Sequence, residues 1–353
     1  MIEIVSGIYQ IQLPLPYTPV GDMSLGENLS QTNVYCIQGN TGWLLVDSGW
    51  NDPKNIQIMK SGLQEIGIDF KDISQIAITH SHLDHFGLAG ELQEITGAAL
   101  FLHQGERRFI EPRGVKAETI LKEMRDWLSR NGTPTHETAK LQRLSQGEMH
   151  FISPVFPDVV SFTGKVGSPD KFLSGGETID TGFFRFEVLW TPGHSPGHIC
   201  LYEQTKKILI SGDHVLSRIT PEIGLNPLSS LNPLGDYIKS LESLKELEVE
   251  IVLPGHEEYF ADLRTRIAEL IQHHQRRKED ISRVLMTRPE QVAYKIAMRI
   301  PWMPEKGGKP WEELDHWGHR MALMETLAHL NLLKEEGKVR TIDKDGFDYY
   351  LNM

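Results

Sequence analysis

Short apolar runs rich in β-branched residues fill the first hundred residues, and Gly or turn-forming polar residues bound each run. These runs are IEIVSGIYQIQL, TNVYCIQG, GWLLVDSG, ISQIAITH and GAALFLH. Between them, residues 53–67 and 86–97 carry apolar positions at helical spacing. The first part of the chain therefore predicts strands that alternate with helices in a layered α/β arrangement.

The pattern changes between residues 104 and 172, where charged, helical and Pro-interrupted segments replace the strands. Because structureless connections beyond about 15 residues are uncommon, this stretch predicts a helical insertion, which could cover an active site. Strands then return in TIDTGFFRFEVLWTPG, ICLYEQTKKILISGD and VEIVLPG. Each of the last two ends in a polar signature, and such strand ends are where many α/β sites are built.

Beyond residue 260 the pattern is mostly helical, in LRTRIAELIQHHQRRKEDISRVL, EQVAYKIAMRI and RMALMETLAHLNLLKEEG. The chain finishes on KVRTIDKDGFDYYLNM, which predicts two short strands around the turn DKDG. Helices followed by a two-stranded wing predict a winged-helix-like module over 261–353. The preceding domain would cover 1–260.

Composition narrows the class of protein. None of the apolar runs in the 353 residues approaches the roughly 18 that a membrane helix needs. The net charge of −12 lies almost entirely before residue 271, which disfavours a nucleic acid as the main partner. The start lacks the charged region of an export signal, and Cys36 and Cys200 lie in apolar strand-like runs. We therefore expect buried free thiols and a cytoplasmic protein.

The stretch THSHLDHFG, residues 79–87, gathers metal-ligand side chains in a loop between a predicted strand and a predicted helix. Within six positions it places His80, His82, Asp84 and His85. A lone histidine is usually a hydrogen-bonded or surface residue, but four ligand residues together favour a zinc site. Residues this close in sequence do not form one closed tetrahedral shell. Further ligands must come from elsewhere, and two metals could be held.

Three more signatures place a His or an Asp directly after an apolar β run: TPGHSPGH at 191–198, SGDHVL at 211–216 and LPGHEEY at 253–259. Together with HSHLDH, and preceded by LLVDSG at 44–49, this order resembles the metallo-β-lactamase fold superfamily over roughly residues 1–260. The resemblance implies an α+β fold of four layers, an αββα sandwich. The helical insertion and the winged-helix-like module would be additions to it.

The resemblance also implies roles for individual residues. One metal would be held by His80, His82 and His194, and a second by Asp84, His85 and His256, with Asp213 bridging the two. Asp47 resembles the acidic residue that braces the site from outside the ligand set. On local sequence alone, Asp47 and Asp213 are also typical of turn residues. We expect packing, supporting or surface roles for His103, His198 and His214.

Such a site indicates hydrolysis. Two zinc ions, with iron or manganese left open, would activate a shared water, and Asp84 would orient this nucleophile as well as bind metal. The bond cleaved would be an ester, thioester, lactone or amide of a small acyl substrate. Apolar and aromatic residues of the insertion could wall an acyl pocket, although a small core of the insertion is their commoner role. They are Phe109, Trp127, Met149, Phe151 and Phe156.

Several alternatives stay open at this stage. Persulfide dioxygenases resemble the same motif set but use a single iron with two histidines and one aspartate. Nucleases of the superfamily also exist, yet the predicted helix before the wing carries only Arg320 before its last turn, whereas nucleic-acid readers have basic helices. A flavodiiron protein or a scaffold without activity fits the motifs less well. The added module is compatible with a homodimer.

Overall fold

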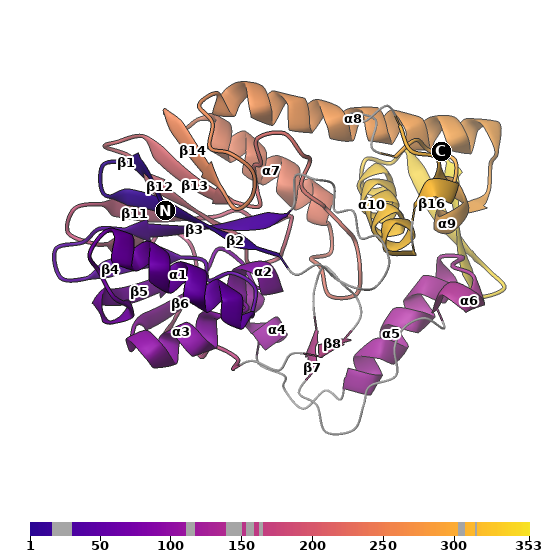
Figure 1. Ribbon diagram of the computed structural model, residues 1–353. Helices are drawn as coiled ribbons and strands as arrows, with labels where there is room; N and C mark the ends of the chain where they lie inside the picture. Colours follow the sequence, from indigo (N-terminus) through magenta and orange to yellow (C-terminus); the bar gives the residue numbers. More distant parts are fainter. Residues whose placement is uncertain are drawn as a thin grey trace.

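Two β-sheets packed face to face form the larger part of the protein, seen in the computed structural model of Figure 1. The structure describes residues 1–15, 30–110, 117–138, 150–152, 159–161, 165–302, 308–314 and 316–353. The first sheet has the order β1 (Ile2–Val5), β2 (Ile8–Pro14), β3 (Gln31–Ile37), β4 (Trp43–Val46), β5 (Ile73–Ala77), β6 (Ala99–His103) and β9 (Lys171–Leu173). The second has the order β10 (Thr178–Asp180), β11 (Arg185–Trp190), β12 (Ile199–Glu203), β13 (Ile208–Gly212) and β14 (Ile251–Pro254).

The first sheet is mixed, with an antiparallel part and a parallel part. From β1 to β4 the neighbours are antiparallel, while β4, β5, β6 and β9 run parallel. In the second sheet only β13 and β14 are parallel. A parallel pair needs a crossover connection, and here helices supply most of these crossovers. They are α1 (Pro53–Glu65), α2 (Leu83–Phe86) and α3 (Ala89–Thr96) on the first sheet and α7 (Pro233–Lys245) on the second.

The alternation of side chains along each strand explains the layers. In β3, Val34 and Cys36 join a core shared with α1 and α3, whereas Tyr35 and Ile37 point to the core between the sheets. On β12, Cys200 packs into a third core against α7 and the start of α8 (Leu263–Thr287). Helices thus cover the outer face of both sheets, which gives the predicted α+β sandwich of four layers.

Local signals fix where the covering helices begin. At α1, Asp52 accepts a hydrogen bond from the Lys54 N–H, and Pro53 occupies the first turn. At α7, the Asn232 side chain accepts from the Gly235 N–H in the same way. Helix α1 lies within the segment 53–67 where helical spacing predicts it, whereas α7 was not foreseen.

The segment between β6 and β9 is not purely helical. It holds α4 (Arg107–Ile110), α5 (Ala117–Arg130) and α6 (Thr135–Thr138), but also an antiparallel pair of strands, β7 (His150–Ile152) and β8 (Val159–Ser161). Short 3-10 turns, η1 (Phe70–Asp72) and η2 (Gln104–Glu106), precede β5 and α4. Helix α5 packs against the C-terminal module through Met124 and Leu128. Whether the insertion covers a site stays a prediction.

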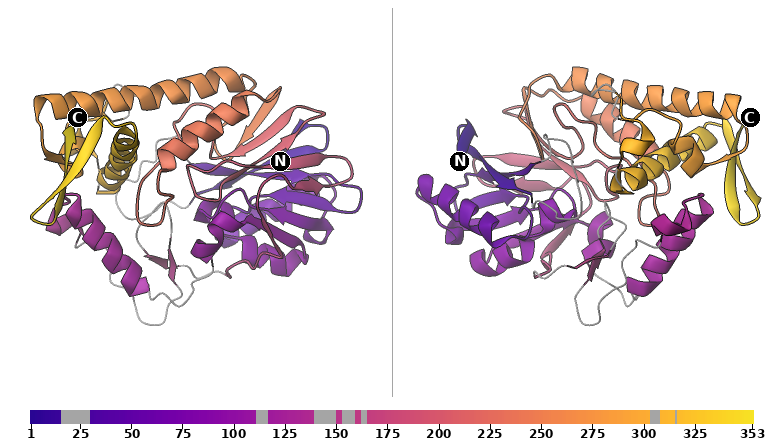
Figure 2. Two further views of the ribbon diagram at one scale, coloured as in Figure 1. Left: turned by 180° about the vertical axis from the view of Figure 1, so that it is seen from behind. Right: turned by 45° about the vertical axis from the view of Figure 1, so that its right-hand side comes forward.

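The C-terminal module combines α9 (Ala293–Ala297), α10 (His316–Glu335) and a 3-10 turn at Trp311–Glu313 with a small sheet. The sheet has the order β15 (Gln291–Val292), β17 (Phe347–Asn352) and β16 (Val339–Lys344). The two strands predicted around DKDG are confirmed, and the third, β15, was not foreseen. As Figures 1 and 2 show, α8 runs from the sandwich to this module.

Helix α8 belongs to two cores at once. Its first turns, with Leu263 and Ile267, pack under the second sheet, and its last turns, with Ile281 and Leu285, pack in the C-terminal core. A helix of 25 residues is about 38 Å long, enough to reach both. The boundary predicted at residue 260 thus divides regions that share a packed helix.

Two sequence expectations concern burial. Cys36 and Cys200 are buried free thiols, as predicted. Among the residues that the structure describes, none of the helices combines the length and the hydrophobicity needed to cross a membrane.

Candidate metal centre

The polar signatures of the sequence meet at one edge of the sandwich, where strands of both sheets end. Residues 79–87 follow β5, Asp213 follows β13 and His256 follows β14, while residues 191–198 connect β11 to β12. Side chains from both sheets can therefore point to one place, which a single strand with alternating faces cannot arrange.

Three imidazole nitrogens converge in the first group of this site. His194 Nε2 lies 3.3 Å from His80 Nε2 and 3.0 Å from His82 Nδ1. Asp213 Oδ2 lies 3.7 Å from His194 Nε2 and 4.0 Å from His80 Nε2. With Zn–N bonds of about 2.0 to 2.1 Å, two tetrahedral ligand nitrogens stand roughly 3.3 Å apart. The spacing of the three histidines matches that shell.

A second group stands beside the first. His256 Nε2 lies 3.3 Å from His85 Nε2 and 3.2 Å from Asp84 Oδ2. Asp213 also reaches this group, because its Oδ1 is 3.4 Å from His85 Nε2 and its Oδ2 is 3.3 Å from His256 Nε2. The structure thus brings together all seven predicted ligands, in groups of His80, His82, His194 with Asp213 and of Asp84, His85, His256. Asp213 lies between the two groups.

Because most of the ligand side chains are buried, a bound cation would stabilise this arrangement. The side chains of His80 and His85 are fully buried, and Asp213 Oδ1 is a buried carboxylate oxygen that forms no hydrogen bond within the described parts of the chain. Imidazole lone pairs and carboxylates that face one another without donors between them repel unless a positive charge joins them. The donor set, with histidines and aspartates alone, fits zinc or a similar divalent ion.

For four of the five ligand histidines, the ring nitrogen that points away from the centre meets an oxygen atom. This contact assigns the proton to the outer nitrogen and leaves the inner one as a ligand. The partners are Thr79 Oγ1 for His80 (3.0 Å), Asp47 Oδ2 for His85 (2.8 Å), the Glu222 carbonyl for His194 (2.9 Å) and the Gln31 carbonyl for His256 (2.7 Å). Imidazoles held in this way are oriented before any ion binds.

Asp47 occupies the place predicted for it. Besides His85, it accepts hydrogen bonds from the Thr79 N–H at 2.7 Å and from the Thr79 hydroxyl. Its backbone is left-handed, with φ of 64°, which a non-glycine residue adopts at an energetic cost. The carboxylate therefore supports two ligand residues, because Thr79 in turn contacts His80.

The electrostatics of the two groups differ. Burial, followed by repulsion from neighbouring histidines, holds the pKa of His80 and of His82 well below its usual value. Burial acts in the same direction on His256, but Asp213 and Asp84 outweigh it and raise the pKa to about 10. The carboxylates likewise raise the pKa of His85 well above its usual value against the effect of burial. The first group therefore offers neutral imidazoles, and the second strongly favours a positive charge.

Glu106, which the sequence motifs did not indicate, joins the two ligand loops. Its fully buried carboxylate accepts hydrogen bonds from the Ser81 N–H and hydroxyl, from the Ser195 hydroxyl at 2.7 Å and from the Gly197 N–H at 2.6 Å. Ser81 lies between two ligand histidines and Ser195 follows a third. The available signal was a glutamate in the turn directly after β6, a position like those of the other site residues.

The other histidines near the site are buried rather than exposed. His198 Nε2 accepts the Asp213 N–H at 3.1 Å, and both ring nitrogens of His214 are buried without a hydrogen-bond partner among the described residues. His103 stacks on Trp190. The surface alternative is therefore wrong for these three, and supporting or packing roles agree with their contacts.

Five apolar or aromatic residues of the insertion could wall a pocket or form a core of the insertion, and they differ in where they lie. Phe109 lines a small pocket that also contacts His82 and His194. Trp127 packs instead against the C-terminal core. Met149, Phe156 and the side chain of Phe151 lie outside what the structure describes.

Comparison with known proteins agrees with this geometry. The sequence model of the Metallo-beta-lactamase superfamily matches residues 28–256. The chain is 25% identical to a "Probable metallo-hydrolase YqjP" of Bacillus subtilis, over 98% of each chain. It is 28% identical to an "Acyl-coenzyme A thioesterase MBLAC2" of Gallus gallus, over 65% of this chain and 74% of the relative.

A solved structure extends the likeness beyond the matched domain. The metallo-beta-lactamase family protein of Thermus thermophilus superposes with a TM-score of 0.74 at 28% identity and covers 99% of this chain and 100% of its own. The match thus includes the C-terminal module. From these matches and from the site at the sandwich edge, the chain belongs to the metallo-beta-lactamase superfamily.

Proposed function

We propose that the protein is a hydrolase that uses two zinc ions to cleave an ester, thioester or lactone. One observation carries the proposal: two groups of ligand atoms lie side by side, and Asp213 reaches both. His80, His82 and His194 would hold one ion, Asp84, His85 and His256 the other, and Asp213 would contact both. The alternative, a single iron with two histidines and one aspartate, would leave four of these seven residues without a role.

The chain's own residues suit a hydrolytic step. When bound, paired zinc ions supply a water of lowered pKa and polarise a carbonyl oxygen. Asp84 is the most accessible of the acidic ligands, with 21% of its side chain exposed against 9% for Asp213. A carboxylate at the open side of the site can accept a hydrogen bond from the attacking water and orient it. The superfamily relatives named as a metallo-hydrolase and a thioesterase support the reaction class.

The substrate class, the cellular location and the oligomeric state are also parts of the proposal. The substrate would be a small acyl compound and not a nucleic acid. The run QHHQRRK, residues 272–278, is the most basic part of α8. His274 and Arg277 of this run are buried and Lys278 pairs with Glu336, so the run is not an open cationic face. A cytoplasmic location, a winged-helix-like role of the C-terminal module and a homodimer are further predictions. The two buried free thiols are consistent with the first of these.

Metal analysis combined with substrate screening tests the proposal. Protein purified without added metal should contain about two zinc ions per chain, and it should hydrolyse members of a panel of thioesters, lactones and aryl esters. Removal of the metal by a chelator should abolish turnover, and added zinc should restore it. Replacing Asp84 by Asn should lower kcat by more than it raises KM, because the carboxylate acts on the nucleophile.

One result would overturn the proposal. A content of one iron per chain, with oxygen uptake on a persulfide and without hydrolysis of the panel, would assign the protein to the dioxygenase alternative instead.

A further inference from the structure

A small pocket lies beside the first group of ligands and is built from five separate stretches of the chain. Its lining includes His82, His194, Phe109 of α4, Leu228 and Met324 of α10. The pocket thus contacts two residues that would hold metal. A group bound in it would lie next to the scissile bond.

The C-terminal module fixes the loop that lines this pocket. The Leu225 N–H donates to the Met324 carbonyl at 3.0 Å, and the Asn331 side chain donates to the Leu231 carbonyl at 3.0 Å. On the side of the module, Met324 and Asn331 both belong to α10. The pocket is therefore shared between the sandwich and the module, and its shape depends on α10.

Among the polar residues of the pocket wall, Glu222 stands apart. Asn226 Oδ1 already accepts the N–H groups of Leu228 and Ser229, and the Ser229 hydroxyl bonds within the same loop. Glu222 Oε1 is shielded from solvent and has no hydrogen-bond partner in the described ranges of the chain, and no ion pair to this carboxyl is found there. Its backbone carbonyl, by contrast, holds His194.

A buried polar atom without a partner is costly, because it has lost its water and gained nothing in return. A site in which such an atom pairs with a ligand hydroxyl or ammonium rejects the apolar analogue, because the atom is then left without a partner. The thiol carrier of a thioester is large and must extend into solvent. The small pocket therefore suits the acyl end of the substrate.

We propose that this pocket binds the acyl group of the substrate and that Glu222 selects acyl chains carrying a hydrogen-bond donor, a hydroxyl or an ammonium, beyond the scissile carbonyl. This inference rests on the proposed function, and it assigns Glu222 as a specificity-determining residue. Met324 gives the C-terminal module a direct part in the same selection.

The experiment compares thioesters of one thiol whose acyl groups are matched in shape: 3-methylbutanoyl, 3-hydroxybutanoyl and 3-aminobutanoyl. With the zinc-loaded enzyme, kcat/KM should be at least about 10-fold higher for a donor-bearing chain than for the methyl isostere. Glu222→Leu should remove this preference. Glu222→Gln keeps an oxygen acceptor, so it should retain a preference for the hydroxyl and lose one for the ammonium. This variant therefore shows which of the two donors Glu222 selects.

Controls separate selection from folding. Glu222→Met replaces the leucine variant if the latter does not fold, and Glu187→Gln, an exposed glutamate on β11, should leave the preference unchanged. A wild-type enzyme that prefers the methyl isostere, or a hydroxyl preference that survives in Glu222→Leu, would overturn the inference.

A second readout keeps the two proposals distinguishable. Calorimetric titration of the zinc-loaded protein with 3-hydroxybutyrate and 3-methylbutyrate measures the pocket without turnover. If no thioester is cleaved but the hydroxy acid binds more tightly in the wild type and not in Glu222→Leu, the proposed hydrolysis fails and the pocket assignment stands. Equal binding of the two acids in both proteins would refute the assignment.

Discussion

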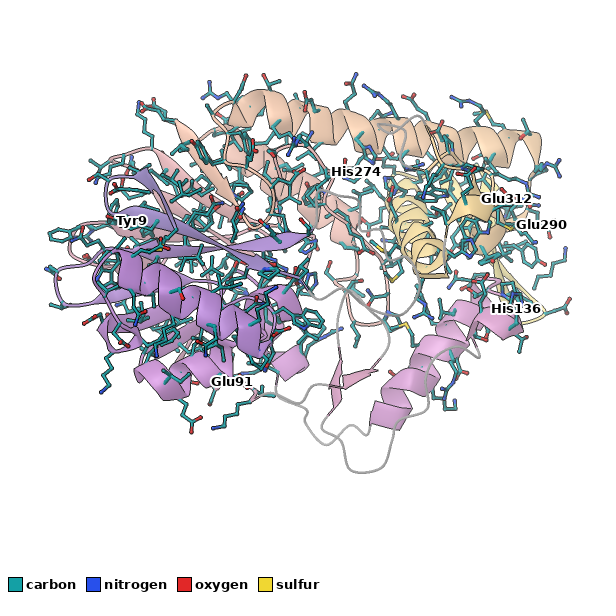
Figure 3. All side chains as sticks on the ribbon, in the orientation of Figure 1. Tyr9, Glu91, His136, His274, Glu290 and Glu312 are labelled. Carbon is teal, nitrogen blue, oxygen red and sulfur yellow. The ribbon has the colours of Figure 1, made fainter. Side chains whose placement is uncertain are left out.

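Two clusters of buried histidines lie in this molecule, and they are built in opposite ways. At the candidate metal centre, ring nitrogens from different loops converge on one another, with 3.0 to 3.3 Å between them. In the C-terminal region, His274 of α8, labelled in Figure 3, and His329 of α10 are joined in a row. His329 Nδ1 contacts the Glu325 carbonyl at 2.7 Å, and its Nε2 lies 3.1 Å from His274 Nδ1.

The two clusters differ in whether each contact pairs a hydrogen-bond donor with an acceptor. In the C-terminal cluster each contact pairs one donor with one acceptor, and Arg277 neutralises the Glu325 carboxylate at 3.0 Å. The cluster is complete without an added ion, apart from one buried nitrogen, His274 Nε2. At the metal centre the outer nitrogens of four ligand histidines are already bonded, so their inner nitrogens face one another as acceptors. Convergent acceptors indicate a cation site, and a donor-to-acceptor row indicates packing.

The largest effect is expected from removing a convergent ligand. His82→Ala should abolish turnover and lower the zinc content from about two ions per chain to about one, because the first group would keep only two imidazoles. The unfolding midpoint of the metal-free variant should stay near that of the metal-free wild type, since no donor loses its partner. Elemental analysis, steady-state kinetics and thermal unfolding measure the three quantities.

A histidine beside the other cluster is the control. His273→Ala, on α8 near Glu325, should leave zinc content and turnover unchanged. Loss of zinc in this variant, or full activity in His82→Ala, would break the distinction between the clusters.

The sequence predicted the fold and the ligands better than it predicted their supports, and the reason is distance along the chain. HSHLDH places four ligand residues in one turn after a strand, and each remaining ligand also follows an apolar strand, so local patterns reveal them. Glu106 bonds to residues 25 and 89 positions away, and its own neighbourhood is an ordinary turn. Strand β15, with two residues, is too short to produce an alternating pattern.

A smaller effect is expected from loosening the support of the convergent cluster. In Glu106→Gln the amide donor would face a Ser81 or Gly197 donor, so the two ligand loops would separate. Metal affinity at the His80, His82 and His194 position should fall about 10- to 100-fold, the usual loss when a supporting group of a metal site is replaced. The second position should change less. Chelator-competition titrations that resolve two binding steps measure both affinities.

Glu203→Gln is the matched control, because Glu203 is also buried and accepts a backbone N–H, that of Lys206, far from the site. It should leave both binding steps unchanged. If Glu106→Gln binds two zinc ions as tightly as this control does, Glu106 does not position the ligands.

The smallest effect concerns the pH dependence of the C-terminal cluster. Burial lowers the pKa of His329 to about 4, whereas the unfolded chain has a histidine of pKa about 6.5. Between these values the unfolded state binds more protons, so stability rises with pH and is lost as the pH falls from about 6.5 towards 4. From pH 7 to pH 5 this residue should lower the free energy of unfolding by about 2 kcal/mol. His274, whose pKa burial also lowers, acts in the same direction.

Urea unfolding of the metal-free protein at the two pH values measures this change, and His329→Gln isolates it. The glutamine oxygen still accepts the proton of His274 Nδ1 but does not titrate, so the variant should lose about 2 kcal/mol less than the wild type between pH 7 and pH 5. Protonation at the metal-free centre affects both proteins equally and cancels in the comparison. Equal losses would mean that His329 is protonated in the folded protein, and a donor-to-acceptor row would then no longer describe the C-terminal cluster.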